Sequence, residues 1–160
     1  MRIGHGYDAH RLKPGRDCIL CGVKIPYELG PDGHSDADLP AHALMDALLG
    51  AAALGDIGRL FPDSDEKYRG ADSMALLSDV SSRLTIKGLT VSNADVTIVA
   101  ERPKIAPYVQ QMRENLAKAM DVPVDRVSVK ATTEEHMGFT GDGTGIAAHA
   151  VVLLNELQSE

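Results

Sequence analysis

The sequence has no tryptophan and few other aromatic residues, with two phenylalanines and four tyrosines among 160 residues. Its core must therefore consist of aliphatic side chains and methionine, and a hydrophobic fraction of 44% is enough to build one. The length suits one compact domain, which we expect to span residues 1–160. Because a domain of this size leaves much apolar surface unburied, an oligomer is compatible with the sequence.

Basic residues are in deficit, since 16 Lys and Arg stand against 23 Asp and Glu and the net charge is −7. Nucleic-acid binding depends on neutralising phosphates, so this balance argues against a nucleic-acid partner. No apolar stretch is long enough to span a bilayer, and the first residues, MRIGHGYDAH, lack the apolar region of a signal peptide. We expect no membrane partner and a cytoplasmic location, or the plastid stroma if a transit peptide has been removed.

Cysteine is also scarce, because Cys18 and Cys21 are the only two and form a single C-x-x-C. This spacing can be redox-active in a βαβ unit, and two such pairs can bind zinc. No second pair is present, and the surrounding segment alternates like a strand, which would point the thiols in different directions. We interpret both cysteines as small hydrophobic residues.

The distribution of apolar and turn residues predicts the element order β-β-α-α-β-α-β-β. The predicted strands span residues 2–7, 18–27 (as a strand or hairpin), 90–101, 126–132 and 146–154, and the predicted helices span 39–54, 72–87 and 107–120. Because helices and strands mix without strict βαβ alternation, we expect an α+β fold, a two-layer sandwich with a mixed four-stranded sheet packed on helices. Residues 30–38 should form a surface loop, and 56–70 a functional loop.

Acidic residues and histidines in two places suggest a metal site. Asp8 and His10 point the same way if their segment is extended, so a carboxylate and an imidazole would converge. Asp38 can cap the helix that follows it, and His42 and Asp46 share its helical face. Asp8, His10 and His42 would supply the three-ligand pattern of catalytic zinc, although unrelated polar ends explain the spacing equally well. Asp46 could support a ligand or touch substrate.

Two further segments could bind phosphate. His34 and Ser35 precede a helix N-terminus, where backbone N–H groups attract phosphate, although a capping loop also explains them. Residues 130–135 read KATTEE, in which threonine hydroxyls could bind phosphate and a carboxylate could hold Mg²⁺, with a solvated strand end as the alternative. The segment GFTGDGTG lacks the spacing of a dinucleotide fingerprint and precedes a strand-like run, so we interpret it as a glycine turn.

Four segments match one known family in the order expected. They read RIGHGYDAH, GHSDADLPAHALMDALLGAAALGDIGRLFPDSD, ADVTIVAERPKIAPY and VKATTEEHMGFTGDGTGIA, and they span nearly the whole chain. On these motifs the sequence resembles the 2-C-methyl-D-erythritol 2,4-cyclodiphosphate synthases of the non-mevalonate isoprenoid pathway. The resemblance implies a homotrimer with an active site at each subunit interface.

The resemblance also implies roles for individual residues. It assigns Zn²⁺, or a similar divalent transition metal, to Asp8, His10 and His42, and Mg²⁺ or Mn²⁺ to Glu135. His34 and Thr133 match residues that stabilise the transition state. The residues implied in substrate binding are Asp8, His10, His34, Ser35, Asp46, Asp56, Ile57, Gly58, Phe61, Pro62, Asp63, Ser64, Asp65, Ala100, Glu101, Arg102, Pro103, Lys104, Ile105, Ala106, Thr132, Thr133, Glu134, Glu135 and Phe139.

The implied reaction converts 4-diphosphocytidyl-2-C-methyl-D-erythritol 2-phosphate to 2-C-methyl-D-erythritol 2,4-cyclodiphosphate and releases CMP. Its substrate is thus a cytidine-diphosphate-linked small molecule. Two alternatives belong to other classes: a metal-dependent phosphohydrolase that uses the same site, and a non-catalytic trimeric nucleotide-binding regulator. Many family members carry arginine where this chain has Asp142, which reverses a charge expected near the trimer axis.

Overall fold

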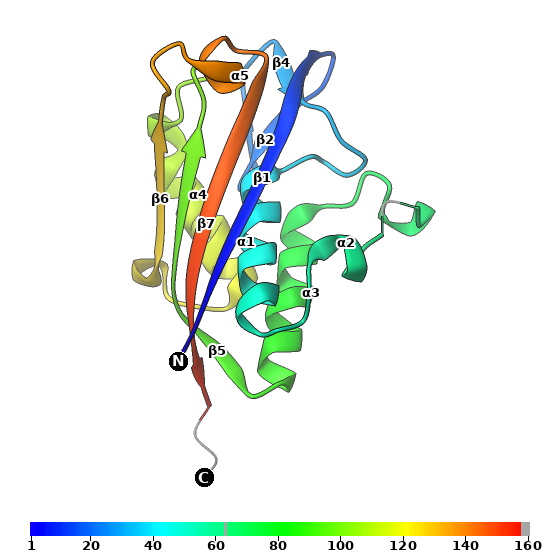
Figure 1. Cartoon of the computed structure of the whole chain (residues 1–160), viewed down its shortest axis with the longest axis vertical. Helices are drawn as coiled ribbons and strands as arrows, with labels where there is room; N and C mark the ends of the chain where they lie inside the picture. Colours follow the sequence, from blue (N-terminus) through cyan, green and yellow to red (C-terminus); the bar gives the residue numbers. More distant parts are fainter. Residues whose placement is uncertain (63, 158–160) are drawn as a thin grey trace.

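A mixed sheet with helices over one face forms the body of the molecule (Figure 1). The computed structural model describes residues 1–62 and 64–157. The strand order in the main sheet is β4-β1-β7-β5-β6, in which β7 runs antiparallel to β1 and β5 while β5 and β6 are parallel. The strands are β1 (Arg2–Pro14), β4 (Leu29–Pro31), β5 (Leu89–Val99), β6 (Val127–Thr132) and β7 (Gly145–Glu156), and a separate hairpin contains β2 (Cys18–Leu20) and β3 (Val23–Ile25).

The helical layer packs on this sheet, with α1 against β1 and β7, α3 against β5, and α4 against β6. The helices are α1 (Leu39–Ala51), α2 (Ile57–Leu60), α3 (Ser73–Ile86), α4 (Val109–Met120) and α5 (Gly138–Gly141), with short 3-10 turns at Glu66–Tyr68, Ala106–Tyr108 and Val124–Arg126. Because α4 connects β5 to β6, those two strands can run parallel, as a crossover connection requires. The α+β class and the mixed sheet are therefore as expected.

Two expectations need correction, one about the number of strands and one about a loop. The main sheet has a fifth, short strand, since β4 pairs with the end of β1 through Leu12 and Pro31. The expected surface loop over residues 30–38 is therefore partly interior, and Gly30, Pro31 and Asp38 are buried. A Cβ atom on Gly30 would lie 2.3 Å from the carbonyl oxygen of Asp17, so this turn-type residue instead permits close packing.

Helix ends were predicted with mixed success. Asp38 and Asp72 cap α1 and α3 as their positions suggest, each accepting a hydrogen bond from an amide in the first turn. However, α1 ends at Ala51 rather than near Gly55, and Ala53 takes the left-handed conformation with φ of 55°. Residues 56–70 contain α2 and a 3-10 turn, and the expected glycine turn contains α5.

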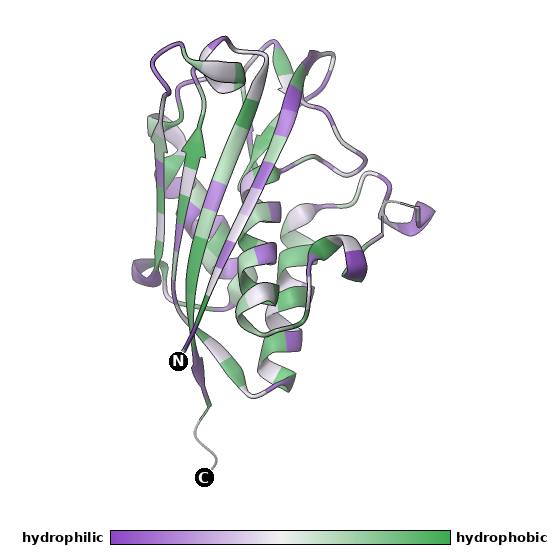
Figure 2. Cartoon of the chain, viewed as in Figure 1, coloured by the Kyte–Doolittle hydropathy of each residue, from purple (hydrophilic) through white to green (hydrophobic). Residues whose placement is uncertain are grey.

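The core lies between the sheet and the helices and is almost wholly aliphatic, as the scarcity of aromatics predicts. Figure 2 shows hydrophobic residues along much of β7 and α1, whereas β1 is largely hydrophilic. Strand alternation leaves Ile3, Tyr7 and Val151 exposed on the sheet face opposite the helices. Within the described residues, no helix is both long and apolar enough to cross a membrane.

Candidate metal centre and adjoining cavity

Strand β1 and helix α1 bring three potential metal ligands together. Alternation along β1 directs Asp8 and His10 to the side that faces α1, and His42 lies in the first turn of that helix. The helix can approach the strand because β1 carries glycine at positions 4 and 6. A Cβ atom on either glycine would lie 1.9 Å from a carbonyl oxygen of α1, so any side chain there would force the two elements apart.

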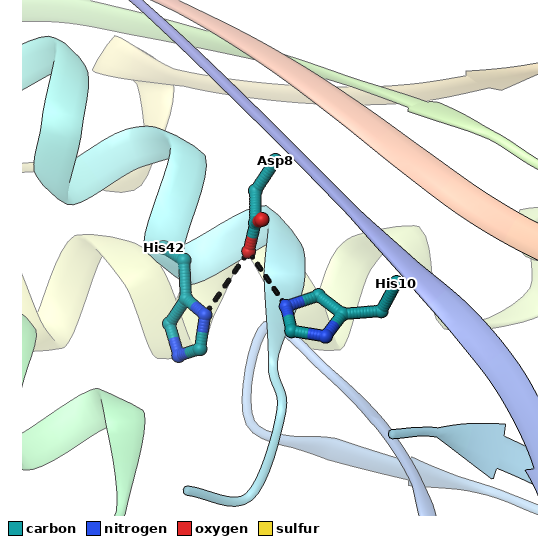
Figure 3. A group of neighbouring side chains, drawn as sticks. All are labelled: Asp8, His10 and His42. Atoms are coloured by element: carbon teal, nitrogen blue, oxygen red, sulfur yellow. Dashed lines mark hydrogen bonds and ion pairs between the residues drawn. The ribbon is translucent and has the colours of Figure 1, made fainter. Parts of the chain in front are cut away.

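The ligand atoms of these three residues converge on one point (Figure 3). Oδ2 of Asp8 lies 2.9 Å from Nε2 of His10 and 3.1 Å from Nδ1 of His42. All three ligand atoms lie within 4.8 Å of one another. The convergence predicted from the spacing is therefore present, although Asp8 and His42 are 34 residues apart in the sequence.

The two imidazoles keep the Asp8 carboxyl between them in its ionised form. Burial raises the pKa of the Asp8 carboxyl, but hydrogen bonds and charge attraction from His10 and His42 outweigh burial and lower this pKa to about 2. The hydrogen bond with Asp8 raises the pKa of His10 against the opposing effect of burial. Asp8 is consequently a carboxylate at neutral pH and can act as a negatively charged ligand.

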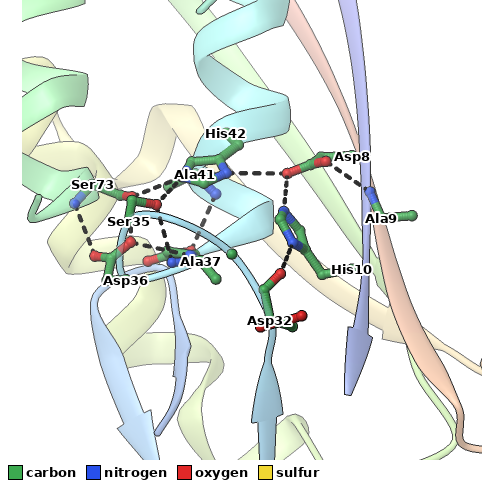
Figure 4. A network of polar contacts seen from close by, with 12 residues as sticks. Asp8, Ala9, His10, Asp32, Ser35, Asp36, Ala37, Ala41, His42 and Ser73 are labelled. Carbon is green, nitrogen blue, oxygen red and sulfur yellow. Dashed lines mark hydrogen bonds and ion pairs between the residues drawn. The ribbon is translucent and has the colours of Figure 1, made fainter. Parts of the chain in front are cut away.

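In both His10 and His42, the imidazole nitrogen that faces away from Asp8 also has a hydrogen-bond partner (Figure 4). Nδ1 of His10 lies 2.5 Å from the carbonyl oxygen of Asp32, which can only accept, so Nδ1 carries a proton and Nε2 is the nitrogen left to bind a metal beside Asp8. Nε2 of His42 lies 3.0 Å from Oγ of Ser73 and 3.3 Å from Oγ of Ser35. Hydrogen bonds on the far nitrogen are the usual support of histidine ligands in metal sites.

Two imidazole nitrogens and one carboxylate oxygen suit zinc or a similar divalent transition metal. The hydrogen bonds on the far nitrogens of His10 and His42 fit this assignment, because they determine which nitrogen each ring offers to a metal. The three ligands also leave one side open to a cavity of about 240 Å³. A catalytic metal needs such an open position for substrate.

The cavity beside the ligands contains several of the expected substrate-binding residues. Its lining residues are Asp8, His10, Gly33, His34, Ser35, His42, Met45, Ile57, Gly58, Phe61, Glu66, Tyr68, Arg69 and Leu76. The ring of Phe61 packs edge-on against Tyr68, with ring centroids 5.3 Å apart, and forms an apolar wall. Sequence reasoning missed five lining residues, because only the fold brings them to the site: Met45 of α1, Glu66, Tyr68 and Arg69 of the following loop, and Leu76 of α3.

The expected substrate-binding residues 100–106 line a different groove, of about 750 Å³. Its lining residues are Pro26, Tyr27, Glu28, Ala100, Glu101, Arg102, Pro103, Lys104, Ile105, Ala106, Pro107, Ala131, Thr132 and Thr133. Oε2 of Glu101 is buried there without a hydrogen-bond partner among the described residues. This groove and the cavity beside Asp8, His10 and His42 have no lining residue in common.

The remaining expected residues follow β6 and are exposed. Oγ1 of Thr133 accepts a hydrogen bond from the amide of Glu135 at 3.3 Å, which forms a local turn. Glu134 accepts a hydrogen bond from the hydroxyl of Thr140, and Phe139 lies beside the end of β1. Glu135 therefore does not reach the group of Asp8, His10 and His42 within one chain.

A comparison with known sequences decides the family. The sequence profile of the YgbB family matches residues 1–155. The chain belongs to the YgbB family.

Relatives of this YgbB chain are similar over almost their full length. The 2-C-methyl-D-erythritol 2,4-cyclodiphosphate synthase of Trichlorobacter lovleyi is 61% identical over 154 residues, which cover 96% of this chain and 98% of that protein. The protein of the same name from Clostridium perfringens is 59% identical, with 96% and 99% covered. A solved structure of 2C-methyl-D-erythritol-2,4-cyclodiphosphate synthase in its CDP-bound form has a TM-score of 0.88 at 40% identity and covers 96% of this chain and 100% of that one.

These similarities confirm the resemblance recognised in the four sequence segments. They support a role for this YgbB chain as an enzyme, a cyclodiphosphate synthase of isoprenoid biosynthesis. The exposed Asp142 is held locally, since its Oδ1 accepts hydrogen bonds from the amide and hydroxyl of Thr144 at 2.9 and 2.7 Å. These hydrogen bonds lower the pKa of Asp142, so it stays anionic.

Several acidic residues of this YgbB chain shape the loop at α2 rather than line the cavity. Oδ1 of Asp46 accepts a hydrogen bond from the amide of Ile57 at 2.8 Å, and Asp56 caps α2 through the amide of Arg59. Asp65 caps the 3-10 turn that follows. Pro62 and Ser64 lie on the same loop, outside the lining of the cavity, and Asp63 lies outside the described residues.

Sequence reasoning also missed a residue that holds the loop over residues 31–35. Arg16 donates to the carbonyl oxygens of Pro31, Gly33 and Ser35 at 3.2, 2.9 and 3.2 Å. An arginine in a sequence does not indicate which carbonyl groups it will contact. These contacts could be found only once the fold had brought residue 16 beside the loop over residues 31–35.

Proposed function

We propose that this YgbB chain converts 4-diphosphocytidyl-2-C-methyl-D-erythritol 2-phosphate to 2-C-methyl-D-erythritol 2,4-cyclodiphosphate with release of CMP. One observation carries the proposal: the ligand atoms of Asp8, His10 and His42 converge at a cavity that His34, Ser35 and other expected substrate-binding residues line. The 61% identity to a protein named for this product supports it. The bacterial relatives support a cytoplasmic location for the reaction.

The reaction is an intramolecular phosphoryl transfer. An oxygen of the 2-phosphate attacks the phosphorus of the diphosphate that is distal to cytidine, the bond from that phosphorus to the CMP oxygen breaks, and CMP leaves with the electron pair. The nucleophile is already anionic, so no strong general base is required.

The main obstacles are repulsion between anions and alignment of the two ends. When bound by Asp8, His10 and His42, Zn²⁺ would supply positive charge that polarises a phosphate oxygen. His34 and Ser35 can donate hydrogen bonds to phosphate beside those ligands, and Phe61 with its apolar neighbours can exclude water from the methylerythritol. Holding both ends of the substrate in line can be worth about 7–11 kcal/mol of the barrier.

The second half of the site would come from another copy of the chain. The groove at residues 100–106 would bind the cytidine, Thr133 would stabilise the transition state, and Glu135 would hold Mg²⁺ or Mn²⁺ against the diphosphate. In one chain these residues lie apart from the cavity, which supports a homotrimer with sites between subunits. The CDP-bound state of a structural relative supports a cytidine nucleotide as the ligand.

Phosphorus NMR of the purified protein with the cytidine-linked substrate tests the reaction. We expect coupled cyclic-diphosphate signals together with CMP, and their loss after a zinc chelator is added. Linear phosphate products would contradict the cyclase and favour the phosphohydrolase. A lack of turnover by protein that contains metal would instead favour the nucleotide-binding regulator.

Subunit mixing tests whether sites form between copies. His42→Ala and Thr133→Ala damage different halves of the proposed site, so each variant alone should be inactive. When the two are unfolded together and refolded, about a quarter of the sites in a randomly mixed trimer should combine two intact halves. Recovered activity supports the shared site, and a mixture as inactive as its parents, at an unchanged trimer mass, contradicts it.

A further inference from the structure

Ser73, the first residue of α3, is fully buried although serine is polar. Its hydroxyl lies between the imidazole of His42, 3.0 Å from Nε2, and the carboxylate of Asp36, 2.5 Å from Oδ1 (Figure 4). It therefore connects a proposed metal ligand to an acidic residue of the loop before α1.

The direction of each hydrogen bond follows from the chemistry of the groups. A carboxylate can only accept, so the Ser73 hydroxyl donates its proton to Asp36. With its only proton committed, Oγ of Ser73 can only accept a hydrogen bond from Nε2 of His42. Nε2 must then carry a proton, and Nδ1, the nitrogen 3.1 Å from Asp8, is the one that can offer its lone pair to a metal.

Asp36 is itself held in place by three hydrogen bonds. Its Oδ2 accepts from the amide of Ser73 at 2.9 Å, while its Oδ1 accepts from the amide of Asp38 at 3.1 Å and from the Ser73 hydroxyl. The carboxylate lies at the N-terminus of α3, where the helix dipole favours negative charge. Asp36 is therefore a fixed acceptor that determines the orientation of the Ser73 hydroxyl.

We propose that Ser73 and Asp36 are positioning residues that fix the tautomer of His42 with which this protein binds its metal. The proposal rests on the proposed metal centre and extends it beyond its three ligands. Ser73 acts through His42 and does not line the cavity. The arrangement parallels that of His10, whose outer nitrogen donates to the carbonyl oxygen of Asp32.

The arrangement also has a consequence for Ser35. Its Oγ lies 3.3 Å from Nε2 of His42 and accepts a hydrogen bond from the amide of Ala37 at 3.1 Å. Because Ser73 fixes the proton on Nε2, Ser35 has no need to donate to His42. The Ser35 hydroxyl proton can then be donated into the cavity that this residue lines, toward a phosphate oxygen.

The test is zinc affinity, measured on the full-length protein by competition with a chromophoric chelator. Ser73→Ala removes the acceptor for Nε2 and should weaken zinc binding by about 10–100-fold. The matched control is Ser81→Ala, on the same helix, whose hydroxyl donates to the carbonyl oxygen of Met120 at 2.9 Å away from the site. That variant should lose comparable stability and keep the zinc affinity of the unmodified protein.

The outcomes separate the two proposals. Equal zinc affinity in Ser73→Ala and Ser81→Ala, with the unmodified protein binding zinc tightly, would overturn the role of Ser73 alone. If the unmodified protein bound no zinc, the metal centre would be wrong and the role of Ser73 with it. Should Ser73→Ala fail to fold, nitrogen-15 NMR of the zinc-loaded unmodified protein decides, since we expect Nδ1 of His42 bound to metal and Nε2 protonated, and the reverse would refute the proposal.

Discussion

Gly6 of β1 lies so close to α1 that a Cβ atom on it would be 1.9 Å from the carbonyl oxygen of Ala43. Ala43 directly follows the ligand His42, and Asp8 lies two residues beyond Gly6 on the same face of β1. The contact between strand and helix therefore sets the distance between the carboxylate and one of its two imidazoles. Here the packing of the core and the geometry of the site depend on the same atoms.

The first prediction is that Gly6→Ala damages both the fold and the ligand group. Backbone atoms line the contact and cannot rotate away, so the helix must shift, and overpacking of this kind costs about 1–3 kcal/mol or more. We expect a lower midpoint of chemical unfolding and weaker zinc binding by the folded fraction.

Gly50→Ala is the control for this prediction, because nothing lies within 4 Å of the Cβ position of Gly50 on the same helix. Alanine should stabilise an exposed helical position by about 0.5–1 kcal/mol and leave zinc binding unchanged. Normal stability and zinc affinity of Gly6→Ala would refute the claim that this contact sets the site.

The ligands could be predicted because their arrangement is local. Alternation in a strand places Asp8 and His10 together, and helix capping by Asp38 places His42 in a first turn. The sequence pattern could not show that α1 packs on β1 at this point. Gly4 and Gly6 become informative only when the facing carbonyl groups of the helix are known.

The support around the ligands could not be predicted for a different reason. Ser73 is thirty-one residues from His42, and its hydrogen bond depends on how α3 meets the loop before α1. In the sequence, a serine after an aspartate indicates only the start of a helix. Substrate binding by residues 100–106 was expected from the family resemblance, but no spacing rule relates this segment to the cavity beside Asp8.

The second prediction concerns Arg16, which joins three carbonyl groups of the loop over residues 31–35. Arg16→Lys replaces the planar guanidinium, which has several N–H donors, by a single ammonium group that cannot reach all three carbonyl oxygens. We expect a loss of about 1–3 kcal/mol in unfolding free energy. Zinc affinity should fall as well, because this loop carries the carbonyl of Asp32 that orients His10.

Arg113→Lys is the matched control, since Arg113 also donates to backbone carbonyls, those of Val127 and Val124 at 2.7 and 3.1 Å, but on α4. It should lose stability without losing zinc affinity. If the two variants weakened zinc binding to the same degree, the effect would be a general consequence of instability, and Arg16 would have no specific role.

The third prediction is that both cysteines are unreactive in the folded protein. Burial, aided by the nearby charge of Asp38, raises the pKa of Cys18 to about 11 and the pKa of Cys21 well above its ordinary value. Their exposures are 1% and 0%. The thiolate is the reactive form, so modification by a thiol reagent at pH 7.5 should await unfolding and then reach two thiols per chain. Rapid labelling of the folded protein would contradict the interpretation of both as core residues.

The last prediction separates Asp46 from His42, the proposed metal ligand on the same helix. Asp46 holds the amide of Ile57 at 2.8 Å and so fixes the start of α2, which with Phe61 forms part of the cavity wall. Asp46→Ala leaves that amide without its acceptor, at a cost of about 1–3 kcal/mol, and should speed hydrogen exchange at Ile57 by about 10–100-fold. Zinc affinity should be unchanged, while the KM for the cytidine-linked substrate should rise.

The control is Asp56→Ala, which removes the exposed cap at the amide of Arg59 and should speed exchange at Arg59 while sparing Ile57. Loss of zinc from Asp46→Ala would instead place Asp46 among the groups that support the metal.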